Sequence, residues 1–270
     1  MKARVITAVA LLPLLLVVVL LLPSICTAVL FGLMAAIGAY ELLAGTKLVK
    51  ETRMVIYSMA AAFLVPLWCH FGMPHLWGSF GIVVFTAAFF GELLYSKAKM
   101  PVRSIALSVV AGFLLPYLLS ALVRLHGREH GNFYILIPFA LAFLSDSGAY
   151  FVGRAFGKHK LAPVVSPNKT VEGAVGGVLG AVVGMELFCL VVGLGFKLEV
   201  NYLYALIYGV VGSLAGVFGD LSFSAVKRQS GIKDYGNLIP GHGGILDRFD
   251  SMMLIAPVTE ILMLLIPVVV

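Results

Sequence analysis

Residues 173–195 read GAVGGVLGAVVGMELFCLVVGLG, an apolar run with one carboxylate side chain, Glu186. A run of about 20 apolar residues is long enough to cross the hydrocarbon core of a bilayer as an α-helix. It does not alternate between polar and apolar residues, as a membrane β-strand would. Because lipid tolerates no unpaired backbone, this segment predicts a transmembrane helix.

The rest of the 270-residue chain has the same character. Hydrophobic residues make up 61% of it and charged residues 12%, whereas about 25% of an ordinary soluble domain is charged. This composition excludes a soluble enzyme, a disordered chain and a secreted disulfide scaffold. We expect an all-α polytopic integral membrane protein with about nine transmembrane helices, near residues 5–22, 25–45, 54–72, 77–95, 104–123, 132–152, 173–195, 201–222 and 251–270.

The basic residues predict how these helices are oriented. With the N-terminus inside, 16 Lys and Arg residues fall in cytoplasmic loops and 3 in outer loops. Such a bias follows the positive-inside rule, so we expect a cytoplasmic N-terminus and an outside C-terminus. The formal charge of +6 is then explained by topology, and we expect no nucleic acid as a partner.

Two of the cytoplasmic loops, 153–172 and 223–250, are longer and more polar than the others. We expect residues 1–130 to form a scaffold of transmembrane helices. Residues 131–270 should carry a cytoplasm-facing site built around the two loops. From composition alone, a solvated connector would explain the second loop equally well.

Carboxylates border these loops. Asp146 precedes Arg154 by eight residues, which is about 12 Å of helix into the membrane. An ionised side chain there normally faces a cavity and has a partner. For any single aspartate, a helix cap or a salt bridge is the alternative explanation. We infer a pocket that combines Asp146, Asp220, Asp247 and Asp250 with a basic rim of Lys169, Lys227, Arg228, Lys233 and Arg248.

Clustered carboxylates beside cations suggest a divalent ion together with phosphates. Mg²⁺ prefers oxygen ligands, usually one or two carboxylates plus phosphate oxygens. The sequence offers no set of His and Cys residues suited to Zn²⁺. The pattern therefore predicts a magnesium-dependent site for a phosphorylated substrate.

Small residues recur at 4-3-4 spacing on the three helices that border the loops. Such faces let membrane helices pack closely, and they are as compatible with a homodimer as with a tight monomer. The three faces consist of Ala142, Asp146, Ala149 and Gly153; of Gly173, Gly177, Gly180 and Gly184; and of Gly209, Ser213, Gly216 and Asp220.

The stretch from Ser224 to Asp250, SAVKRQSGIKDYGNLIPGHGGILDRFD, closely resembles the signature of the phosphatidate cytidylyltransferases, also called CDP-diacylglycerol synthases. Residues 166–173, SPNKTVEG, resemble the second cytoplasmic motif of that family. The resemblance implies transfer of CMP from CTP to phosphatidic acid, giving CDP-diacylglycerol and pyrophosphate. It also implies that the reaction depends on Mg²⁺. The protein is then expected in the cytoplasmic (inner) membrane, in contact with membrane lipids.

Nucleotidyl transfer of this kind requires mainly positioning and the neutralisation of phosphate charge. As metal ligands we expect Asp220 and Asp247, with Asp146 as a further choice, and a second cation would be compatible. As catalytic residues we expect Asp220, Asp247, Lys169, Lys227, Arg228 and Asp250. As substrate-binding residues we expect Asp146, Asn168, Lys169, Lys227, Arg228, Lys233, Gly241, His242, Gly243, Gly244 and Arg248.

Two other functions fit part of the sequence. A related CTP-dependent transferase for another lipid phosphate or a polyprenol phosphate would share these residues and differ only in its lipid cleft. A secondary transporter for an anionic solute would also combine Gly-rich helices with buried aspartates. The sequence shows no inverted repeat, which disfavours the transporter.

Two glutamates, Glu41 and Glu92, lie near the predicted cytoplasmic ends of helices and do not require a functional role. Glu41 is expected to snorkel towards the interface or to pair with Lys47. Glu92 is expected to do the same with Lys97.

Overall fold

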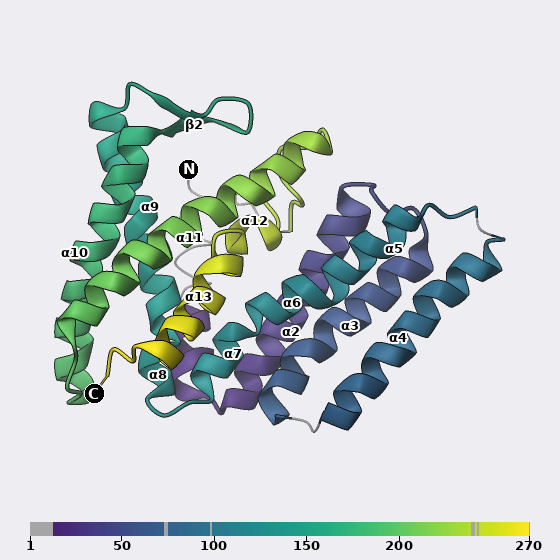
Figure 1. The fold of residues 1–270 in the computed structure, drawn as a ribbon, viewed down its shortest axis with the longest axis horizontal. Helices are drawn as coiled ribbons and strands as arrows, with labels where there is room; N and C mark the ends of the chain where they lie inside the picture. Colours follow the sequence, from purple (N-terminus) through teal and green to yellow (C-terminus); the bar gives the residue numbers. More distant parts are fainter. Residues whose placement is uncertain (1–12, 73–74, 98, 239–240, 242, 270) are drawn as a thin grey trace. The chain divides into compact units, whose positions relative to one another are not determined.

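The structure is a computed structural model, and helices dominate it (Figure 1). It describes residues 13–72, 75–97, 99–238, 241 and 243–269. Contacts between these residues divide the chain into two compact units. Unit 1 consists of Met1–Gly127 and Ser230–Arg248, and unit 2 consists of Arg128–Gln229 and Phe249–Val270.

Unit 1 is built from long apolar helices. α2 packs along α3, and Gly32 of α2 faces Phe63 of α3 so closely that a side chain on it would collide. Residues 13–21 are also helical. The named elements are α2 (Ser24–Tyr40), the π-helical segment η1 (Glu41–Gly45), α3 (Thr52–Phe71), α4 (His75–Tyr95), α5 (Val102–Val109), the π-helical segment η2 (Val110–Leu114), α6 (Leu115–Leu119) and α7 (Ala121–His126).

Unit 2 is a bundle of helices with a small β-hairpin between α9 and α10 (Figure 1). The hairpin strands are antiparallel, with Lys160 opposite Thr170 and Ala162 opposite Ser166. The elements are α8 (Gly131–Tyr134), α9 (Leu136–Phe156), β1 (Lys160–Ala162), β2 (Ser166–Thr170), α10 (Val171–Phe196), α11 (Tyr202–Gln229) and α13 (Met252–Leu265). The short α12 (Leu246–Phe249) bridges the boundary between the units in the chain.

Helices α9 and α10 contact one another backbone to backbone. A Cβ atom added to Gly180 would lie 3.0 Å from the Gly148 Cα and 3.0 Å from the Leu144 carbonyl oxygen. A Cβ atom on Gly177 would lie 3.1 Å from the Ser145 carbonyl oxygen. The prediction that the small face of α10 serves helix packing is therefore confirmed.

Seven of the described helical stretches are long and apolar enough to cross a membrane, which supports an all-α polytopic membrane protein. They are Ser24–Gly45, Thr52–Phe71, Gly78–Tyr95, Val102–His126, Gly131–Phe156, Val171–Gly195 and Tyr202–Gln229. Of the two other expected spans, 5–22 lies partly outside the described residues. The span expected at 251–270 forms α13, whose 14 residues extend about 21 Å. The number nine and the orientation stay predictions.

The second long loop begins later than expected, because α11 continues to Gln229. No Gly or Pro interrupts the chain between Gly219 and Gly231. Lys227 and Arg228 fall in the last turn of α11, where positive charge interacts favourably with the helix dipole. The expected start of this loop at residue 223 is therefore wrong. The loop between the last turn of α11 and α12 lies in unit 1.

Candidate active site

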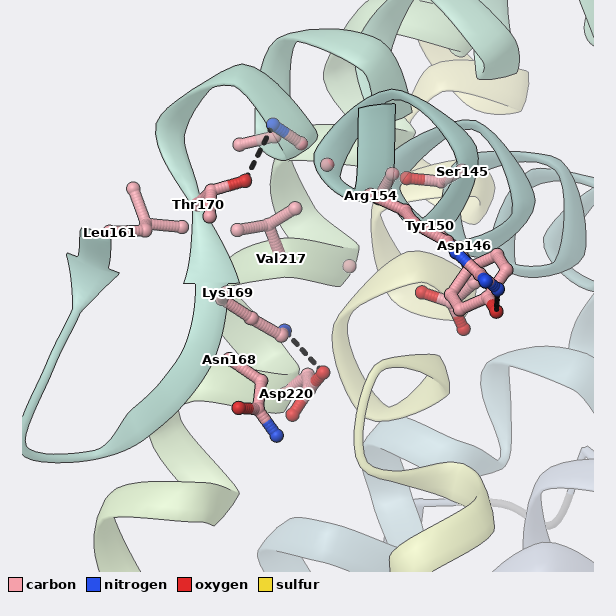
Figure 2. Close-up of a pocket in the computed structure, with 15 residues that line it drawn as sticks. Ser145, Asp146, Tyr150, Arg154, Leu161, Asn168, Lys169, Thr170, Val217 and Asp220 are labelled. Atoms are coloured by element: carbon pink, nitrogen blue, oxygen red, sulfur yellow. Dashed lines mark hydrogen bonds and ion pairs between the residues drawn. The ribbon is translucent and has the colours of Figure 1, made fainter. Parts of the chain in front are cut away.

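A pocket of about 490 Å³ lies in unit 2, where α9, α10 and α11 meet the β-hairpin (Figure 2). Four of the expected site residues line it: Asp146 from α9, Asn168 and Lys169 from β2, and Asp220 from α11. Small residues such as Gly153, Gly173 and Gly216 form other parts of the wall. The pocket therefore combines polar groups from three separate stretches of the sequence.

The centre of polarity in this pocket is an ion pair between Lys169 and Asp220. The Lys169 Nζ donates a hydrogen bond to the Asp220 Oδ2, and both side chains are 28% exposed. The second oxygen of the carboxylate, Oδ1, accepts a hydrogen bond of 3.1 Å from the Ser224 hydroxyl. The pair joins the hairpin to α11 and holds the Asp220 carboxylate at the pocket wall.

Asp146 is exposed on α9 and lines the same pocket. The residues of α9 that contact the glycines of α10 include Leu144, Ser145, Gly148, Ala149, Val152 and Gly153. On the same helix, Arg154 donates a hydrogen bond of 2.8 Å to the Tyr150 hydroxyl, and both residues also line the pocket. Ser145, Ala149 and Gly153 contact the glycines of α10 and also line the pocket, so the packing face of α9 borders the pocket directly.

The donor atoms of the pocket fit a hard cation such as Mg²⁺. Among its described lining residues the potential ligands are carboxylate, amide and hydroxyl oxygens, and none is His or Cys. Within the described part of the chain, no three His, Cys, Asp or Glu side chains form a group that could hold a metal ion. Mg²⁺ usually takes one or two carboxylates and completes its shell with water and phosphate oxygens. Asp146 and Asp220 could supply such a pair.

The hairpin is fixed at both of its ends. The Thr170 hydroxyl caps α10 by accepting a hydrogen bond of 3.0 Å from the Gly173 N–H. The Glu172 carboxylate accepts hydrogen bonds from the backbone N–H groups of Lys158 and His159, and it lies 2.6 Å from the His159 Nδ1. These contacts hold Asn168 and Lys169 on a strand of defined orientation.

The last turn of α11 adds two of the expected cations. The Arg228 Nε donates a hydrogen bond of 3.2 Å to the Val165 carbonyl oxygen in the hairpin. The Lys227 Nζ lies 3.9 Å from the Asp250 Oδ2, and these side chains are only 10% and 13% exposed. Lys227 was expected on an open rim, whereas the structure buries it against a carboxylate.

The remaining expected residues belong to unit 1. Lys233 and Arg248 are exposed, and His242 lies outside the described residues. Gly241 and Gly243 have φ angles of +77° and +84°, which residues with a side chain adopt rarely. Asp247 is buried, and its Oδ2 accepts hydrogen bonds of 2.8 Å and 3.0 Å from the N–H groups of Tyr235 and Gly244.

Sequence reasoning misjudged Glu41. This residue is 4% exposed and accepts hydrogen bonds from the backbone N–H groups of Ile245 and Leu246. The expected snorkelling is therefore wrong. The spacing already disfavoured a pair with Lys47, because Lys47 is six residues away and side chains that meet on one helix face are three or four residues apart.

Glu92 also has a partner that was not expected. Its carboxylate lies 3.6 Å from a guanidinium nitrogen of Arg53, a residue of the neighbouring helix α3. The preference for Lys97 assumed a partner close in sequence. The observed partner, Arg53, instead comes from a different helix and lies 39 residues earlier in the sequence.

Comparison with known proteins identifies a family and several relatives that this chain resembles. The model of the cytidylyltransferase family matches residues 2–266 of this chain. Proteins named phosphatidate cytidylyltransferase from Staphylococcus epidermidis and Bacillus subtilis are each 47% identical to it, over 137 and 129 residues. A protein of the same name from Staphylococcus aureus is 46% identical over 142 residues. The matches cover 51%, 48% and 51% of this chain and 51%, 46% and 51% of the relatives, so the chain aligns with about half the length of each relative.

Proposed function

This chain belongs to the cytidylyltransferase family, and from that premise we propose that it transfers CMP from CTP to phosphatidic acid, giving CDP-diacylglycerol and pyrophosphate. The observation that carries the proposal is the half-buried pair of Lys169 and Asp220 in a pocket of oxygen donors. A cation and a carboxylate held together suit a substrate that brings both phosphates and a metal ion. The name of the relatives, phosphatidate cytidylyltransferase, supports phosphatidic acid as the acceptor.

The reaction joins an oxygen of the lipid phosphate to the α-phosphorus of CTP. The bond from that phosphorus to the oxygen of the β-phosphate breaks, and pyrophosphate leaves. A phosphate monoester is already largely ionised near neutral pH, since its second pKa is about 6. The protein therefore needs no strong base, and its residues act by orienting the two phosphates and neutralising their charge.

Within the pocket, Asp146 and Asp220 would hold Mg²⁺, with a second cation compatible with the same donors. When bound, the metal ion polarises the phosphate oxygens and neutralises the leaving pyrophosphate. Lys169 would exchange its contact with Asp220 for a phosphate oxygen of the substrate. Asn168, beside it on β2, would donate a hydrogen bond to a phosphate or to the nucleotide.

The last turn of α11 would contribute positive charge about 10 Å further along the helix. Lys227 and Arg228 follow Asp220 by seven and eight residues. In this proposal, Lys227 and Arg228 neutralise the part of the phosphate charge that lies beyond the reach of Lys169. Asp250 would keep the ammonium group of Lys227 oriented through their contact of 3.9 Å.

In unit 1, the proposal concerns the turn around Gly243 and Gly244. Asp247 is a candidate metal ligand by its place in the motif. Asp247 also stabilises the shape of this turn, because its carboxylate accepts hydrogen bonds from the N–H groups of Tyr235 and Gly244. Donors of the turn, with Gly241, His242, Lys233 and Arg248, would bind the leaving pyrophosphate.

The proposal includes a location and an orientation. The protein would lie in the cytoplasmic (inner) membrane with nine spans, its N-terminus inside and its C-terminus outside. The division of basic residues between inner and outer loops, 16 to 3, supports this orientation. Phosphatidic acid could then reach the site from the inner leaflet while its acyl chains stay among membrane lipids. A homodimer stays a prediction.

The test is conversion of labelled CTP and phosphatidic acid into a lipid-extractable nucleotide by the detergent-purified protein, with and without Mg²⁺. Product that depends on Mg²⁺ supports the proposal. Product only with a polyprenol phosphate or another lipid phosphate would identify a related transferase instead. No product with any of these acceptors would contradict transferase activity, and uptake of anionic solutes into proteoliposomes would then test the transporter.

A further inference from the structure

We propose that Glu41 is a positioning residue for the transfer reaction, although it lies in the first third of the chain and outside both motifs. It would act by fixing the turn of residues 243–246, whose neighbours Gly241 and His242 are expected to contact the leaving pyrophosphate. The inference rests on the proposed function and extends it to a residue of the helix pair α2 and η1.

The contacts of Glu41 are directed at one short stretch of backbone. Its Oε1 accepts a hydrogen bond of 3.0 Å from the Ile245 N–H, and its Oε2 accepts one of 2.8 Å from the Leu246 N–H. The partners are 204 and 205 residues away in sequence. One carboxylate therefore holds two successive N–H groups.

The surroundings are shaped to fit this carboxylate. A Cβ atom added to Gly244 would lie 2.5 Å from both carboxylate oxygens of Glu41. A Cβ atom added to Gly236 would lie 2.6 Å from the Oε1. A side chain on either glycine would therefore occupy the volume that the Glu41 carboxylate fills.

Asp247 completes the arrangement within unit 1. Its Oδ2 accepts a hydrogen bond of 3.0 Å from the Gly244 N–H, next to the two N–H groups that Glu41 holds. Three consecutive N–H groups are therefore bound by two carboxylates. Gly243 precedes them with a φ angle of +84°, which glycine adopts readily and residues with a side chain adopt rarely, so the shape of this turn depends on glycine at position 243.

The local backbone of Glu41 is also unusual. Glu41 begins the π-helical segment η1, and its carbonyl oxygen accepts a hydrogen bond of 3.2 Å from the Thr46 N–H, five residues later. A π-turn changes the direction of the side chains by adding one residue to the helical turn, and such turns are frequent at functional sites. In the same segment, Gly45 lies against the Tyr235 carbonyl oxygen. The segment therefore contacts the loop at two points.

A merely stabilising role would give a different result from a positioning role. The decisive variants are Glu41→Gln and Glu41→Ala, with Glu92→Gln as the matched control on another helix of unit 1. We expect Glu41→Gln to lower kcat about tenfold or more while the KM for phosphatidic acid changes less than about twofold. Because the amide of Gln leaves one of the two N–H groups without an acceptor, the kinetic constants are measured well below the melting temperature of each variant, and Glu92→Gln should leave both constants unchanged.

Hydrogen–deuterium exchange supplies a readout that is independent of activity. Glu41→Ala should accelerate exchange in residues 243–248 while the peptides of α3 and α9 keep their protection. Equal acceleration in all peptides would indicate global destabilisation and overturn the positioning role. Unchanged exchange in residues 243–248 would overturn it as well.

A double-variant test uses the close contact with Gly236. Gly236→Ala alone should lower kcat, because its Cβ atom displaces the carboxylate. In the Glu41→Ala background the same change should add little, since the space is then open, and additive losses would contradict the inference. A wild-type protein without transferase activity would overturn the proposed function, whereas an active wild type with unaffected Glu41 variants would overturn this inference alone.

Discussion

The ammonium group of Lys169, on the second strand of the hairpin, is hydrogen-bonded to the carboxylate of Asp220, 51 residues later in α11. Each group compensates the charge of the other at a pocket wall where both are only partly exposed. A substrate that carries phosphates with a metal ion offers each group a new partner of the correct sign. The pair therefore prepares the pocket for a ligand of mixed charge.

Asp220→Asn should reduce turnover about 100-fold or more. A neutral amide cannot replace an anionic ligand of Mg²⁺, and it cannot form an ion pair with Lys169. The measurement is CMP transfer by the purified variant, beside its thermal unfolding in detergent. Glu129→Gln is the control, because that carboxylate is 91% exposed. Substantial activity in Asp220→Asn would remove Asp220 from the metal site.

Lys169→Ala should raise the KM for CTP about tenfold or more and lower kcat, because a phosphate loses its cationic partner. Lys169→Arg should recover part of the loss, since it restores the charge at a different geometry. Lys160→Ala removes an exposed lysine from the other strand of the same hairpin and should have no effect. Equal losses for Lys160 and Lys169 would mean that the hairpin acts through its overall charge.

Gly180→Ala should destabilise the protein by about 1–3 kcal/mol, which is typical of overpacking. The new methyl group would meet the backbone of α9 at 3.0 Å. Gly195→Ala is the control in the same helix, because an added Cβ atom there has no neighbour within 4 Å. Thermal unfolding in detergent compares the two. Equal stability of both variants would show that α9 moves away from α10 without cost.

Lys227→Met should destabilise the protein by about 1–3 kcal/mol, because the Asp250 carboxylate, which is only 13% exposed, loses the cation that lies 3.9 Å away. Adding Asp250→Asn should restore part of that stability, since no buried charge is then uncompensated. A double-mutant cycle on the free energy of unfolding measures the coupling. If the two losses are simply additive, the contact of 3.9 Å between these side chains contributes no coupling energy.

The sequence was sufficient for the spans because membrane insertion depends on local hydrophobicity. Among the described residues, six of the expected helices begin and end within four residues of their observed limits, whereas the helix expected at 201–222 ends seven residues later, at Gln229. Asp146 and Asp220 were recognisable as pocket residues for a similar local reason: a carboxylate within an apolar segment needs a cavity or a partner. The likeness to known motifs added Asn168 and Lys169, which line the same pocket.

The contact of Glu41 with Leu246 could not be derived in this way, because 205 residues separate the two groups. Hydrophobicity says which segments enter the membrane but leaves the partner of a polar side chain open. The hairpin was missed because its strands have only three and five residues, too few for a clear alternation. The end of α11 was misjudged because polar composition was taken as evidence against a helix.

The glycine contact between α9 and α10 also has an evolutionary consequence. On the side of α10 that faces α9, only the volume of a residue is under selection, and almost every substitution is too large. The opposite side carries Val175, Leu179, Val183 and Leu187, which are 55–60% exposed and need only be apolar. Substitutions should therefore accumulate along α10 with the period of the helix, rarely on one side and freely among aliphatic residues on the other.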